Sequence, residues 1–243
     1  MLQKKPILEV RKAKFAYRKN TPVLRNISFE AFPGEIIGVL GENGSGKSTL
    51  LKLLVGMLTP QEGTLRYRGS VGYCPQDLLL FEFLTVAEHF RLYGAGYRLV
   101  KDDISQKQQY LLEKLRFAQY EHEQVRDLSG GTKQKLNLSL ALLHDPDILL
   151  LDEPYQGFDY DTFLRFWELQ DDFRAKSKTI LIVSHLIEDR SKLDRTVTLR
   201  NGYSTPCDPG CHCRTCLGDH ENVKSTKASL GTSEVPVMST REH

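Results

Sequence analysis

The sequence predicts an α/β fold with a parallel sheet covered by helices on both faces, and three observations support this class. A short apolar run (35–40) leads through a glycine-rich loop into an apolar helical segment (48–58). Later in the chain, apolar strands alternate with helix-type segments, which is the order that builds parallel sheets. The residues between these parts (77–127) have helical spacing and many charges, so we expect them to form a helical insertion.

The first strands are indicated by their residue types. The stretch ILEVRKAKF (7–15) is rich in β-forming residues, and NISFEAF (26–32) alternates apolar with polar positions. Pro33-Gly34 marks a turn. The run EIIGVL (35–40) contains β-branched residues, so it suits a strand that is buried on both faces.

Strands and helices also alternate in the last third of the chain. ILLLDEP, which begins at Ile148, and TILIVSH (179–185) are expected to be buried strands, with a helix over 159–176 between them. TVTLR (196–200) is expected to be the last strand, followed by a tight turn at Asn201-Gly202.

Composition excludes some classes of function. The 243 residues contain 33 basic and 31 acidic side chains, and the net charge of +2 gives no reason to expect nucleic-acid binding. No window offers the roughly 20 apolar residues that a membrane-spanning helix needs, and the N-terminus has no apolar run of signal-peptide length. We therefore expect a cytoplasmic protein that reaches the membrane only through a partner.

The strongest motif is a glycine-rich loop with the pattern G-x-x-x-x-G-K-[ST]. Glycines let the backbone turn its N–H groups toward phosphates, and the following helix directs its positive end at the same anion. Lys47 would reach the β- and γ-phosphates, and the Ser48 hydroxyl would bind Mg²⁺, with Thr49 nearby. The loop consists of Gly41, Glu42, Asn43, Gly44, Ser45, Gly46, Lys47 and Ser48.

The second motif is an apolar strand that ends in two carboxylates, Asp152 and Glu153. Ligands bind at the carboxyl edge of parallel sheets, so Asp152 is expected to hold Mg²⁺ and Glu153 to orient and deprotonate an attacking water. Because neighbouring strand residues point to opposite faces, the two carboxylates can take different roles. A solvated acidic turn is the alternative.

The third motif is LSGG at 128–131, followed by polar and basic residues. Ser129, Gly130 and Gly131 at a helix N-terminus would offer exposed amides, a hydroxyl and a favourable dipole to a second anion. A plain N-cap by Ser129 is the alternative.

LSGG a short distance before LLLDEP, together with the glycine-rich loop, resembles the ABC family of ATPases. The resemblance spans about Leu8 to Gly202. It implies a P-loop NTPase ABC-type cassette with an antiparallel β subdomain, a parallel-sheet core and an inserted helical subdomain (about 77–143). It also implies ATP and Mg²⁺ as ligands, and a head-to-tail dimer, with itself or a related cassette, in which each signature loop covers the other subunit's ATP.

The same resemblance implies roles for single residues. Tyr17 matches the aromatic residue that stacks on adenine, with a core tyrosine as the alternative and Phe15 as a lesser candidate. Gln76, in GYCPQD, matches the glutamine that contacts Mg²⁺ and the attacking water. Asp159 resembles an aspartate that acts across the dimer, and His185 matches the histidine that contacts the γ-phosphate.

One departure and one finer resemblance accompany this match. Tyr155 follows Pro154 where family members commonly carry Thr or Ser, so the geometry of this loop is expected to differ. The stretch LTVAEHFRLYGAGYRL (84–99) resembles exporter subunits that pair with a separate transmembrane permease. An importer subunit and a soluble, non-transport ABC ATPase remain the alternatives.

The C-terminal part differs in composition from the rest. We expect the ATPase domain to cover 1–204, a Cys-rich metal knot 205–221, and a disordered tail 222–243. Four closely spaced thiols suit Zn²⁺. The alternatives are an iron–sulfur cluster, Cu(I), a reactive tail without metal, or ligands shared with a partner. The thiols belong to Cys207, Cys211, Cys213 and Cys216.

Overall fold

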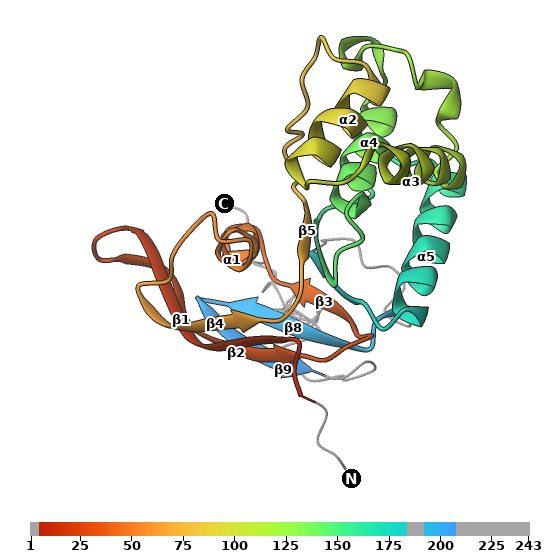
Figure 1. Cartoon of the computed structure of the whole chain (residues 1–243). Coiled ribbons are helices and arrows are strands. Elements are labelled where there is room, and N and C mark those ends of the chain that lie inside the picture. The colour runs from red at the N-terminus through yellow and green to blue at the C-terminus, as the bar shows by residue number, and fades with distance from the viewer. Residues whose placement is uncertain (1–4, 184–191, 208–243) are drawn as a thin grey trace, which may run out of the picture. The chain divides into compact units, whose positions relative to one another are not determined.

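The computed structural model describes residues 5–183 and 192–207, which form a mixed sheet with helices on both sides (Figure 1). In the described residues the order of the nine strands is β4-β1-β2-β9-β8-β3-β7-β6-β5. The strands are β1 (Leu8–Arg18), β2 (Thr21–Ala31), β3 (Ile36–Leu40), β4 (Glu62–Tyr67), β5 (Val71–Cys74), β6 (Ile148–Asp152), β7 (Thr179–Val183), β8 (Arg195–Arg200) and β9 (Tyr203–Cys207).

The sheet divides into an antiparallel part and a parallel part. β1 pairs antiparallel with both β2 and β4, while β3, β7, β6 and β5 pair in parallel. The carboxyl ends of these parallel strands meet at one edge, which places the loops after β3, β5 and β6 close together. The predicted α/β class, with an antiparallel subdomain and a parallel core, is confirmed.

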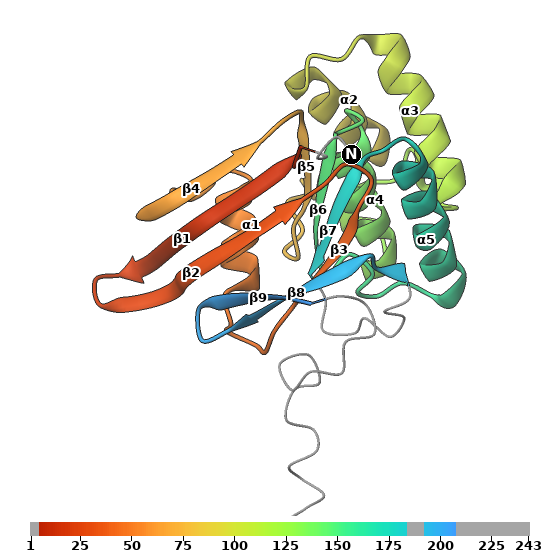
Figure 2. The same cartoon turned by 90° about the horizontal axis from the view of Figure 1, so that it is seen from below.

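Side chains of the parallel strands alternate between two apolar cores, one on each face of the sheet. Ile148 and Leu150 of β6 pack with α1 and the antiparallel strands, whereas Leu149 and Leu151 pack with α4 and α5. Figure 2 shows α1 on one side of these strands and α4 with α5 on the other. The α-helices are α1 (Lys47–Leu54), α2 (Val86–Gly96), α3 (Lys101–Lys114), α4 (Gly130–Leu142) and α5 (Tyr160–Ala175).

The inserted helical subdomain contains α2, α3 and α4, as the sequence predicts. Thr85 begins α2 with a capping box, because its side chain accepts from the Glu88 N–H while the Glu88 carboxylate accepts from the Thr85 N–H. Phe90 and Phe117 are fully buried between the helices. In the described residues, no helix combines the length and the apolar character that crossing a membrane requires.

Three strands were not predicted from the sequence. β4 is an edge strand with mostly exposed side chains and β5 has only four residues, so neither shows an apolar alternation. The Asn201-Gly202 turn leads into β9, which pairs with β8 and makes one parallel bridge to β2, so TVTLR is not the last strand. β9 continues past Ser204, where composition placed the end of the domain, because it supplies backbone partners for β8.

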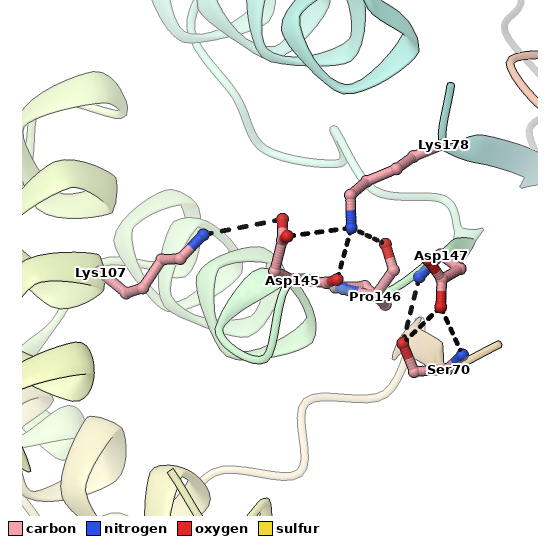
Figure 3. A network of polar contacts seen from close by, with 6 residues as sticks. All are labelled: Ser70, Lys107, Asp145, Pro146, Asp147 and Lys178. Carbon is pink, nitrogen blue, oxygen red and sulfur yellow. Dashed lines mark hydrogen bonds and ion pairs between the residues drawn. The ribbon is translucent and has the colours of Figure 1, made fainter. Parts of the chain in front are cut away.

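A chain of polar contacts holds the loop before β6 between α3 and the start of β7 (Figure 3). Asp145 receives Lys107 of α3 at 3.6 Å and Lys178 at 3.0 Å. The Asp147 carboxylate accepts from the Ser70 N–H at 2.8 Å and from the Ser70 hydroxyl at 3.1 Å. These contacts link α3, the loop before β6 and the segments that lead into β5 and β7.

Candidate functional site

A cavity of about 290 Å³ opens at the carboxyl edge of the parallel strands. It brings together the loop after β3, the N-terminus of α1, the loop after β5 and the end of β6. Its lining residues are Val23, Asn43, Gly44, Gly46, Lys47, Ser48, Thr49, Gln76, Asp152, Glu153 and Val183. All of these except Val23 and Val183 were candidates from the sequence. The two valines were missed because a valine in a strand has the same sequence signal whether it lines a cavity or packs in the core.

Lys47 lies at the base of this cavity and is only 6% exposed. Its ammonium donates to the carbonyls of Gly41, at 2.7 Å, and Glu42, at 3.0 Å. Burial lowers the pKa of Lys47, while the nearby carboxylates of Glu153 and Asp152 raise it in part. The loop thus holds a buried cation at the N-terminus of α1, an arrangement that suits a phosphate chain.

Gly46 caps α1 in a conformation that only glycine adopts readily. Its φ is +100°, and a Cβ at this position would lie 2.7 Å from the Leu24 side chain. Any larger residue would therefore push the loop away from β2. The glycine keeps the first turn of α1, with its unpaired N–H groups, facing the cavity.

Asp152 ends β6 and faces α1. It is 2% exposed and is hydrogen-bonded to the Ser48 side chain. Burial raises the pKa of Asp152, against the lowering effects of the Ser48 hydrogen bond and the Lys47 charge. A carboxylate and a hydroxyl oxygen side by side are ligands that Mg²⁺ prefers, so this pair fits the ion that the sequence predicts.

Glu153 lies directly after β6, and its backbone leaves the extended conformation with φ +50°. Its N–H still donates to the Val183 carbonyl at 2.9 Å. Strand alternation would place Asp152 and Glu153 on opposite faces, yet both line the same cavity, because the strand ends at Asp152 and Glu153 is left-handed. Such strained residues persist where the surrounding structure holds them.

Two further candidates contribute from neighbouring segments. Gln76, in the bend after β5, lines the cavity. Tyr17 of β1 is 57% exposed, so the alternative of a core tyrosine is excluded. Its hydroxyl lies 3.3 Å from that of Thr49, and its ring meets Phe15 edge to face at 4.9 Å. The tyrosine ring is thus beside the cavity and offers an open π face.

The signature loop, which we define as Ser129–Gly131, does not line this cavity. Ser129 is the N-cap of α4 and accepts from the Thr132 N–H at 3.2 Å. Asp159 likewise caps α5, accepting from the Thr162 N–H at 2.7 Å. Hydrogen bonds from the side chain and then the backbone of Thr162 lower the pKa of Asp159. In one chain, both residues therefore make local capping contacts and neither lines the cavity. Their predicted roles across a dimer stay predictions.

Some predicted residues fall outside the described ranges. These are His185 and three of the four clustered thiols, those of Cys211, Cys213 and Cys216. Cys207 lies in β9, opposite Thr196. Within residues 5–183 and 192–207, no three His, Cys, Asp or Glu side chains gather as a metal-binding group.

Comparison with known proteins identifies relatives of this chain. Residues 24–156 match the family model described as "ABC transporter". The chain is 33% identical to an uncharacterized ABC transporter ATP-binding protein of Methanocaldococcus jannaschii, over 76% of this chain and 71% of that protein. It is 35% identical to the Nod factor export ATP-binding protein I of Cupriavidus metallidurans, over 77% of this chain and 65% of that protein.

A solved structure described as the ATP-binding subunit of an ABC transporter is also similar. Its TM-score is 0.78 and its identity is 28%, and the match covers 83% of this chain and 90% of that one. The similarity in sequence and the similarity in structure therefore each cover more than three quarters of the chain.

Proposed function

The chain belongs to the ABC transporter family of ATP-binding domains, and from this premise we propose that it binds ATP and hydrolyses it to ADP and phosphate to power transport. The observation that carries the proposal is the cavity in which Lys47 and Ser48 meet Asp152, Glu153 and Gln76. Phosphoryl transfer needs a cradle for phosphates, metal ligands and a group that orients water, and these residues provide all three.

Binding is assigned to the loop after β3 and to α1. The amides of Asn43 to Ser48 and the N-terminus of α1 would hold the phosphates, and the Lys47 ammonium would pair with the β- and γ-phosphates. The exposed ring of Tyr17 would stack on adenine, a contact that tolerates any flat base. Ser48, Asp152 and Gln76 would hold Mg²⁺, which neutralises charge on the phosphates when it is bound.

Hydrolysis is assigned to Glu153. Its carboxylate would take a proton from the attacking water while the water oxygen bonds to the γ-phosphorus and ADP leaves with the bridging oxygen. Gln76 would orient the same water from the opposite loop. His185, which the resemblance assigns to the γ-phosphate, would complete the site.

The test of this function is the variant Glu153→Gln, which keeps the size of the side chain but cannot accept the proton. We expect ATP binding to persist while the turnover of ATP falls at least about 100-fold, measured as phosphate release and as equilibrium ATP binding. Glu113→Gln is the matched control, because Glu113 is exposed on α3 and its carboxylate accepts from Gln109 on the same helix, away from the cavity. Normal turnover in Glu153→Gln would reassign the base.

A second hollow suggests where a transmembrane partner docks. It has a volume of about 240 Å³ and lies where the helical subdomain meets β5, with Tyr73, Pro75, Leu79 and Tyr93 among its lining residues. Leu79 is 57% exposed, and the following loop exposes further apolar side chains. We propose that a helix of the permease docks here, directly beside Gln76.

Export is the direction that we favour. The relative from Cupriavidus metallidurans is named as an export protein, and residues 84–99 resemble exporter subunits. An importer subunit is the alternative within transport, and a soluble ABC ATPase is the alternative outside it. Co-purification with a multi-span membrane protein separates the transport subunits from the soluble one.

The clustered thiols of the C-terminal part remain a separate proposal. The spacing Cys207-x₃-Cys211-His212-Cys213-x₂-Cys216 suits one tetrahedral Zn²⁺. Metal analysis of the purified chain under reducing conditions tests this proposal. A chain without stoichiometric Zn or Fe would show that the thiols do not form a metal site.

A further inference from the structure

Two buried amide side chains of α4, Gln134 and Asn137, have no part in the assignment above. They are 5% and 6% exposed, on a helix that otherwise buries residues such as Leu136 and Leu138. A buried amide without hydrogen bonds is costly. We therefore expect each buried amide to have hydrogen-bond partners.

Each amide reaches a backbone carbonyl next to a residue of the proposed catalytic site. The Gln134 Nε2 donates to the carbonyl of Pro154, at 3.1 Å, and Pro154 directly follows Glu153. The Asn137 Nδ2 donates to the carbonyl of Pro75, at 2.9 Å, and that carbonyl belongs to the peptide bond that leads into Gln76. One helix thus fixes the chain beside both residues that would orient the water.

The two amides also meet at the thiol of Cys74, the last residue of β5. The Cys74 sulfur lies 3.3 Å from Asn137 Nδ2 and 4.0 Å from Gln134 Nε2. Burial raises the pKa of Cys74, so the thiol stays neutral and serves as a weak acceptor. The three side chains form one buried polar cluster between α4 and the ends of β5 and β6.

The same helix carries the signature loop at its N-terminus. A Cβ on Gly131 would lie only 2.6 Å from the carbonyl oxygen of Gly157, so the signature loop packs directly on the loop that follows Glu153. We therefore expect a movement of α4 to displace this loop. Asn137 also lines the hollow assigned to the permease.

We propose that Gln134 and Asn137 are positioning residues that couple the placement of α4, and with it the signature loop, to the placement of Glu153 and Gln76. The proposal rests on the proposed ATPase function. When α4 is seated on the sheet, the two amides hold both catalytic loops in the arrangement that orients the water. When α4 shifts, the same hydrogen bonds move or break, and hydrolysis slows although ATP stays bound.

Ser139 offers a matched control on the same helix. It is fully buried like the two amides, but its hydroxyl donates to the Lys135 carbonyl within α4 itself. Ser139→Ala therefore removes one buried hydrogen bond of this helix without touching either catalytic loop.

The experiment compares Gln134→Met, Asn137→Leu and Ser139→Ala, each of which removes the side-chain hydrogen bonds described above. For the first two we expect kcat to fall about 10-fold or more, because small misplacements of catalytic groups are costly, with the KM for ATP and the equilibrium ATP affinity within about 2-fold of wild type. Ser139→Ala should keep kcat and show only a lowered melting temperature.

If kcat per folded molecule in Gln134→Met and Asn137→Leu equals that of Ser139→Ala, the amides are structural only and the proposal is wrong. The smaller variant Asn137→Ser, which introduces no overpacking, gives the same comparison should Asn137→Leu not fold. Wild-type turnover in the same assay tests the proposed function itself, so its failure is distinguishable from the failure of this inference.

Discussion

Gly131 illustrates how a single residue sets the distance between two loops. Its backbone approaches the Gly157 carbonyl so closely that even a methyl group would overlap it, with 2.6 Å between the atoms. Gly130, its neighbour in the signature loop, has nothing within 4 Å of an added Cβ. There is therefore room for a side chain at Gly130 but not at Gly131.

We expect Gly131→Ala to lower the free energy of unfolding by about 1–3 kcal/mol, the usual cost of forcing extra volume into a packed region. Gly130→Ala should leave stability unchanged or raise it by about 0.5 kcal/mol, because alanine favours a helix start over glycine. Urea denaturation followed by circular dichroism measures both. Equal stability of the two variants would show that the loops separate without cost.

For single residues, the sequence predicted site residues that belong to a contiguous motif. It did not predict residues whose contacts lie far away along the chain. Lys47 and Ser48 follow from the glycine-rich loop, and both line the cavity. Gln134 and Asn137 could not be predicted, because their partners lie about 20 and 62 positions away along the chain. The shared orientation of Asp152 and Glu153 was also missed, since a left-handed residue at the end of a strand leaves no pattern in the sequence.

Among the elements, the start of α5 is held by a group of aromatic rings. Tyr155 contacts Phe163 and Phe166 edge to face, at 5.5 and 5.6 Å between ring centroids. Phe166 in turn contacts Trp167 at 5.3 Å. The bulky residue that departs from the family pattern thus anchors the loop after Glu153 onto α5.

Tyr155→Thr restores the residue type that family members commonly carry and removes both ring contacts. We expect the free energy of unfolding to fall by about 1–3 kcal/mol, from lost burial and edge-to-face contacts. The emission of Trp167, the only tryptophan of the chain, should shift to longer wavelength as water reaches the group.

Tyr160→Thr is the control for this change, because Tyr160 lies on the first turn of α5 but is 77% exposed. Its effect on stability should stay within about 0.5 kcal/mol. A loss of stability as large as that of Tyr155→Thr would mean that the ring contacts of Tyr155 contribute no more than an exposed tyrosine does.

Elements with a strong local pattern were predicted, and elements defined by their neighbours were not. The apolar runs at β3, β6 and β7 are continuous and could be identified directly. β9 alternates poorly and contains a proline, and it is a strand because β8 offers it backbone partners. Strand pairing depends on the neighbouring strands, so it cannot be predicted from the sequence of one segment alone.

For the whole molecule, the arrangement of the two proposed ATP-contacting parts calls for a second copy. The P-loop lysine lies in the cavity, whereas the signature loop does not line it. Ser129 and Gly130 are exposed at the N-terminus of α4, which suits an anion supplied from outside the chain. In a pair related by a two-fold axis the interface is isologous, so two equivalent sites would form at once.

Mixing two inactive variants tests this arrangement. Lys47→Ala removes the phosphate-binding cation, and Ser129→Arg blocks the signature loop, so each variant alone should lose turnover. In a mixed dimer one site contains two wild-type halves, because the Ser129→Arg chain provides an intact Lys47 and its partner provides an intact Ser129. An equal mixture should therefore recover up to about a quarter of the wild-type rate, the share expected for random pairing in a two-fold dimer.

The doubly substituted chain, which carries both changes, serves as the control and should stay inactive. If the mixture stays inactive while the two variants form mixed dimers, an intact Lys47 and an intact Ser129 on opposite chains do not make a working site, and the proposed arrangement is wrong.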